Sequence, residues 1–77
     1  MNNIRRKALK AILEEIEEIK SRLEDVLFDE EEAFDNMPEN LQGTEKYDRA
    51  EEAISSLEDA IDELDESISD IENAIEQ

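Results

Sequence analysis

The sequence predicts an all-α fold, an antiparallel two-helix coiled-coil hairpin that dimerises into a four-helix bundle. Over residues 53–77, apolar residues recur at alternating spacings of three and four, a pattern typical of a helix that buries one stripe against another helix. Glycine and proline occur once each, which favours long, uninterrupted helices. The 77 residues form a single domain, and its core is small enough for self-association to be expected.

The second helix is expected at residues 45–75 and has the more regular heptads. Its two apolar rows, at the a and d positions of the coiled-coil repeat, are Tyr47, Ile54, Ile61, Ile68 and Ile75, and Ala50, Leu57, Leu64 and Ile71. A third row of small residues flanks them: Ala53, Ala60, Ser67 and Ala74. Small side chains there widen the apolar stripe and permit another helix to approach closely.

The first helix is expected at residues 4–34. We assign its seam to a row with the same alternating spacing: Leu9, Ile12, Ile16, Ile19, Leu23, Val26, Glu30 and Ala33. A second apolar row lies beside this seam: Leu13, Leu27 and Phe34. Glu30 is the one acid in the seam, and we expect it to mark the register through an ion pair with Lys46 or Arg49.

Residues 35–44 are expected to form the turn between the helices. Asn36 suits a left-handed C-cap, and Pro38 would stop the first helix and start a short helical turn. Gly43 permits a sharp bend, and Thr44 is a suitable N-cap for the second helix. An apolar plug is expected to close the turn: Phe34, Met37, Leu41 and Tyr47.

An antiparallel register aligns the two seams. When Leu9 is placed opposite Ile71, every seam residue of the first helix lies opposite a seam residue of the second. The basic residues that start the first helix then lie beside the acids that end the second, so that each group finds opposite charge at an unfavourable helix end. A hairpin has only one mutual face, so the flanking apolar rows would stay half exposed, and we expect a homodimer to cover them.

The composition limits the chemistry that the chain can perform. It has no histidine, no cysteine and a net charge of −17, so we expect no enzyme activity and no specific metal or cofactor site. The same charge disfavours direct binding to nucleic acid or anionic membranes and favours basic partners. Charged residues interrupt the apolar run near the N-terminus, so we expect no signal segment, no membrane span and a cytoplasmic protein.

The acidic side of the second helix is the candidate partner-binding site. Acids occupy two of its outward heptad rows: Glu51, Glu58, Asp65 and Glu72, and Glu52, Asp59 and Glu66. Rows of carboxylates on a rod can resemble a phosphate backbone and occupy the nucleic-acid-binding groove of another protein. Two alternatives stay open: the acids only keep the protein soluble, or self-assembly is itself the function.

The turn has the most distinctive sequence of the chain, Phe-Asp-Asn-Met-Pro-Glu-Asn-Leu-Gln-Gly at 34–43. Residues 29–64, which include it, resemble a group of small acidic proteins encoded by phages and other mobile elements of Gram-positive bacteria. The group has no established reaction or ligand, so the resemblance assigns no site residues. It implies an origin in a phage or mobile element, whose small acidic proteins commonly bind and block a host protein.

Overall fold

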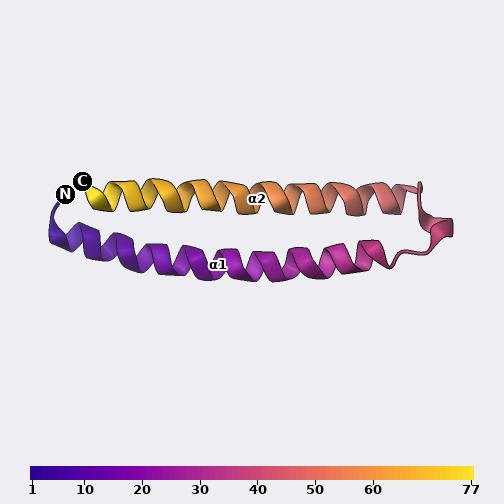
Figure 1. Ribbon diagram of the computed structural model, residues 1–77, viewed down its shortest axis with the longest axis horizontal. Coiled ribbons are helices and arrows are strands. Elements are labelled where there is room, and N and C mark those ends of the chain that lie inside the picture. Colours follow the sequence, from indigo (N-terminus) through magenta and orange to yellow (C-terminus); the bar gives the residue numbers. More distant parts are fainter.

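The structure, a computed structural model that describes residues 1–77, is an antiparallel hairpin of two long helices (Figure 1). Helix α1 spans Asn3–Asp35, a single 3-10 turn, η1, spans Glu39–Leu41, and helix α2 spans Glu45–Glu76. The helices lie side by side in a rod of 59 × 15 × 12 Å, with both chain ends at one end and the turn at the other. The predicted helical hairpin is confirmed. Neither helix has an apolar stretch long enough to cross a lipid bilayer.

Side chains cap the start of both helices. The Asn2 side-chain oxygen accepts a hydrogen bond from the Arg5 N–H at 2.9 Å, and α1 begins one residue before its predicted start. The Thr44 hydroxyl accepts from the Tyr47 N–H at 3.4 Å, so the predicted cap of α2 is confirmed. The predicted left-handed cap at Asn36 is wrong, because this residue has φ −90° and its N–H still donates to a carbonyl one turn earlier in α1.

The turn is closed by a short helical segment, a glycine and a pair of aromatic rings. The predicted short helical turn is present as η1, but it starts one residue later than predicted, with Pro38 as its cap. Gly43 has φ +80° and is the only residue of the chain with a positive φ, a conformation that glycine adopts without strain. The rings of Phe34 and Tyr47 pack with their centroids 4.6 Å apart. All four residues of the predicted apolar plug are half-buried, which confirms it.

The contact surface between the helices is a coiled-coil seam with little fully buried area. On α2 every residue of both predicted rows is half-buried, apart from Ile61. Ile61, with 9% of its surface exposed, is the only buried residue in the chain. On α1 the half-buried positions include this row: Leu9, Leu13, Ile16, Lys20, Leu23, Leu27, Glu30 and Phe34. The hairpin therefore has a seam rather than an enclosed core.

The predicted seam of α1 is wrong at every second position. Four of its residues are exposed: Ile12 (45%), Ile19 (48%), Val26 (54%) and Ala33. Their places facing α2 are taken by Lys20 and by the row predicted to flank the seam: Leu13, Leu27 and Phe34. The two rows have the same spacing and lie on opposite sides of a shared row, so spacing alone did not distinguish them. The orientation found seats Phe34 against Tyr47, and an aromatic ring buries far more apolar area than Ala33 would.

Two contacts between the helices fix the register. At the open end, Arg6 Nε donates a hydrogen bond to the Ile75 carbonyl oxygen at 3.0 Å. At the turn, the packing of Phe34 against Tyr47 joins the end of α1 to the start of α2. Both contacts place Leu9 level with Ile71 to within one residue, so the predicted axial alignment of the antiparallel helices agrees with the structure to that extent. The predicted pairings of Ile12, Ile19, Val26 and Ala33 are not formed, because α1 is rotated about its axis.

Ile61→Ala should lower the free energy of unfolding by about 2 kcal/mol or more, because it removes apolar atoms from the single buried position. Urea unfolding followed by far-UV circular dichroism measures the change. Ile4→Ala is the matched control, since Ile4 is 81% exposed, and its effect should stay within about 0.5 kcal/mol. Both variants are compared at one protein concentration, because the stability of a chain that self-associates depends on its concentration. Equal effects of the two substitutions would show that the seam is misplaced.

Candidate functional site

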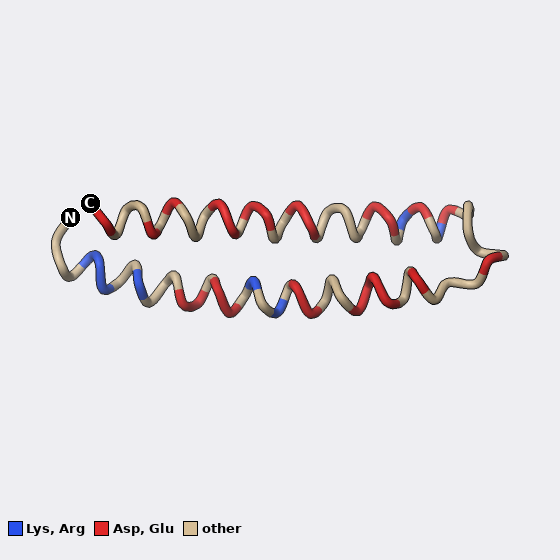
Figure 2. The backbone as a smooth tube through the Cα atoms, viewed as in Figure 1, with Lys and Arg blue, Asp and Glu red and all other residues tan.

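The long sides of the hairpin differ in chemistry, and acids from both helices line one of them. We define the acidic face by two rows, Glu17, Glu24 and Glu31 on α1 and Glu51, Glu58, Asp65 and Glu72 on α2. All of these residues except the half-buried Glu31 are exposed. An open groove of about 340 Å³ runs between the helices on this face, lined by residues of both: Glu24, Leu27, Phe28, Glu31, Glu58, Ile61 and Asp62. Figure 2 shows how acids dominate both helices beyond the basic start of α1.

One ion pair crosses the acidic face. Lys20 Nζ lies 2.5 Å from a carboxylate oxygen of Asp65, and their side chains are 26% and 50% exposed. The hydrogen bond that Lys20 donates to the Asp65 carboxylate is the main cause that raises the pKa of Lys20 above its ordinary value. Partial desolvation opposes it, and the negative charges of Asp65, Glu24 and Glu17 add to it. Lys20 thus keeps its stem in the seam and its ammonium group at the rim.

The structure divides the seven predicted site residues into two groups, all of them exposed. Four lie on the side of α2 next to α1: Glu51, Glu58, Asp65 and Glu72. The groove contact of Glu58 and the ion pair of Asp65 with α1 establish this placement. The other three point away from α1, because they lie roughly half a turn from the seam: Glu52, Asp59 and Glu66. The predicted site is therefore divided between the acidic face and a back row on the far side of α2, which consists of Glu52, Asp59 and Glu66.

Sequence reasoning missed the α1 half of this face. Glu24 and Glu31 line the groove opposite Glu58, and their seven-residue spacing was visible in the sequence. The incorrect rotation of α1 hid their proximity to the acids of α2. Phe28 was missed as well. It is 60% exposed and lines the same groove, so the face offers an apolar anchor among carboxylates, as protein-binding surfaces often do.

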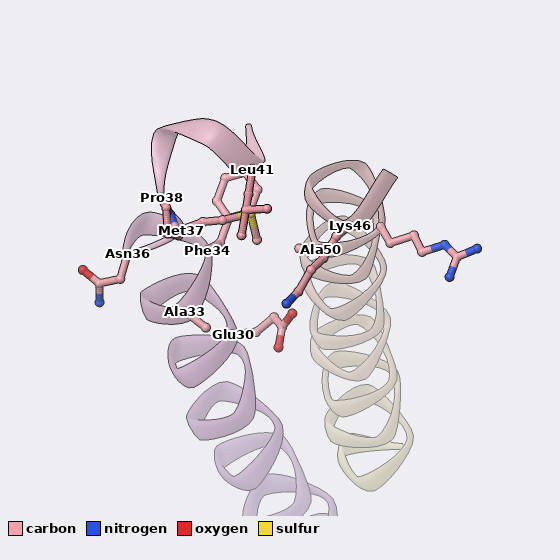
Figure 3. Close-up of a pocket in the computed structure, with 10 residues that line it drawn as sticks. Glu30, Ala33, Phe34, Asn36, Met37, Pro38, Leu41, Lys46 and Ala50 are labelled. Atoms are coloured by element: carbon pink, nitrogen blue, oxygen red, sulfur yellow. The ribbon is translucent and has the colours of Figure 1, made fainter. Parts of the chain in front are cut away.

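A second hollow, of about 440 Å³, lies at the turn (Figure 3). Charged residues of both helices line it beside the apolar plug: Glu30, Lys46 and Arg49. The predicted ion pair of Glu30 with one of these cations is not formed. Arg49 pairs instead with Glu45, one turn earlier on its own helix, where a partner is reached without crossing between the helices. No group of three or more acids in the chain is arranged to hold a metal ion.

Asp65→Asn should move the pKa of Lys20 down toward its ordinary value, because the neutral amide removes the main cause of the raised pKa. A raised folded-state pKa means that the pair stabilises the hairpin while Lys20 is charged. That stabilisation disappears as the pH rises through the raised pKa. NMR titration of the Lys20 side-chain signals measures this pKa in the wild type and in the variant. Glu66→Gln, on the back row, should leave the titration unchanged, and an unchanged pKa in Asp65→Asn would contradict the ion pair.

Comparison with known proteins adds no relative. No family model, no curated protein and no solved structure matches the chain.

Proposed function

We propose that this protein is a non-enzymatic, acidic helical-hairpin module of the cytoplasm that binds a basic surface of a partner protein through its acidic face. In its most specific form, the hairpin blocks a nucleic-acid-binding surface of a host protein. A phage or mobile-element origin, which the turn sequence suggests, fits such a role. The observation that supports the proposal most is the groove in which Glu24, Glu31 and Glu58 from two helices surround the exposed Phe28.

Charge supports a basic partner. The chain has 25 acidic and 8 basic residues, and on the acidic face Lys20 is already paired with Asp65. The remaining carboxylates there have no ion pair within the chain. Their field would attract a basic surface, accelerate association and weaken as salt is added. Phe28 would add the apolar contact that charge alone does not supply.

The mimicry would be one of charge and shape rather than of phosphate positions. Acids at the same heptad position lie ~10.5 Å apart along a helix at 1.5 Å per residue. A nucleic-acid strand carries one charge per ~3.4 Å of its axis, so the two spacings do not match one to one. The 59 Å rod would occupy an elongated basic groove through its overall field.

Two triple variants separate this site from bulk charge. The face variant carries Glu51→Lys, Glu58→Lys and Glu72→Lys, and the back variant carries Glu52→Lys, Asp59→Lys and Glu66→Lys. Each substitutes three exposed acids of α2 at the same heptad spacing, so both change the net charge equally. Immobilised wild type and variants are used to capture proteins from a Gram-positive bacterial lysate. The dissociation constant of each captured, purified partner is then measured.

A basic, nucleic-acid-binding partner should bind the wild type and the back variant alike and bind the face variant at least about tenfold more weakly. A DNA duplex should compete with the hairpin for it, and added salt should weaken the complex. Equal losses in both triple variants would mean that the acids act only as bulk charge. Retained binding by the face variant would refute the site.

Self-assembly is the second candidate function. A specific observation favours it, the row of exposed aliphatic side chains at Ile12, Ile19 and Val26.

A further inference from the structure

The side of the hairpin away from the acidic face is apolar. We define the apolar face by two rows of three residues, Ile12, Ile19 and Val26 on α1 and Ala53, Ala60 and Ser67 on α2. On each helix, this row flanks the seam on one side and the acids of the acidic face flank it on the other. Helical spacing therefore puts both rows of the apolar face on the same long side of the hairpin. The hollow at the turn confirms this, since it is lined by Ala33 and Lys46, which continue the two rows by one heptad.

We propose that a second copy of this chain packs on the apolar face, so that two hairpins form a four-helix bundle with both acidic faces outward. The first argument is burial. One residue of 77 is buried, whereas a domain of this size needs a closed core or an added constraint to be stable. The chain has no cysteine for a disulfide, and no acid cluster is arranged for a structural metal. A second hairpin would enclose the seam.

The cations at the borders of this face favour a second copy as the occupant. The borders of the apolar face carry both signs, with acids in excess: Glu15, Arg22 and Asp29 on α1, and Arg49, Glu63 and Asp70 on α2. Arg22 lines a hollow with Ile19 and Val26, and Arg49 lines the hollow at the turn. A two-fold related copy presents the same mixture, so Arg22 of each copy can find an acid of the other. The acidic face could not bind its own copy in this way, because like charges would meet along its length.

Shape agrees with the same occupant. Each row of the apolar face spans 14 residue steps, ~21 Å of the 59 Å rod at 1.5 Å per residue, so the ~800 Å² that each partner buries in a standard interface would also include the residues that border these rows. The α1 row has large side chains and the α2 row has small ones. Beside the large row, an open hollow of about 280 Å³ between Ile19, Arg22, Leu23 and Val26 can receive a side chain of the second hairpin.

Sedimentation equilibrium tests the proposal. The wild type should be a dimer at tens of micromolar, and its dissociation constant should fall as salt screens the repulsion between two acidic chains. Ile19→Gln with Val26→Gln should raise that constant at least about tenfold. Phe28→Gln is the control, because Phe28 is 60% exposed on the opposite side, and it should leave the dimer intact. A wild type that stays monomeric, or a dimer that the Phe28 variant weakens equally, overturns the proposal.

Cross-linking keeps the test decisive if the double variant fails to fold. The chain has no cysteine, so single substitutions report contacts without background. Ile19→Cys and Ala60→Cys, alone or mixed, should form an intermolecular disulfide under mild oxidation, whereas Phe28→Cys should not. Absence of any disulfide from the first two overturns the proposal. The face variant described above should remain dimeric whether or not it loses its partner, so failure of the dimer and failure of the proposed function are distinguished.

Discussion

The rotation of α1 about its own axis determines the chemistry of every surface of this protein. The shared row that contains Leu9, Ile16 and Leu23 faces α2 in either of two orientations of α1. The orientations differ in which of the two rows beside the shared row also packs against α2. Packing Phe34 against Tyr47 selects one orientation. The hydrogen bond from Arg6 to the Ile75 carbonyl and the ion pair from Lys20 to Asp65 are compatible with it. Turned the other way, α1 would bury Ile12, Ile19 and Val26 and expose Leu13, Lys20 and Leu27.

Some elements could be predicted from the sequence because their residues allow only one arrangement. Helix α2 has a single unambiguous apolar stripe, so its seam, its start after the Thr44 cap and its antiparallel direction were predictable. The turn was predictable from Pro38, whose ring fixes φ, and from Gly43, which adopts a positive φ without strain. Helix α1 has apolar rows on both sides of a common row, and its two candidate seams have equal periodicity. Only packing against α2 could choose between them, because the choice rests on contacts distant in sequence.

The same ambiguity explains how much of the site was predictable. The acids of α2 were assigned correctly to exposed positions, since the stripe of α2 leaves no other place for them. Their division into a face and a back row depends on where α1 lies, and so does the groove formed with Glu24 and Phe28. Lys20 was overlooked because a charged residue in an apolar row looks like an interruption. Its long stem tolerates the seam while its ammonium group reaches Asp65 at the rim.

The placement of the turn has a consequence for the order in which the hairpin forms. The aromatic pair joins residues close in sequence, whereas the Arg6 hydrogen bond at the open end joins residues 69 positions apart. Closing a loop costs entropy that grows with its length, so the first contact is least costly beside η1. Once it exists, each following pair closes only a short additional segment. The hairpin should therefore zip from the turn toward the termini, and its open end should be the first part to fray when the protein is heated.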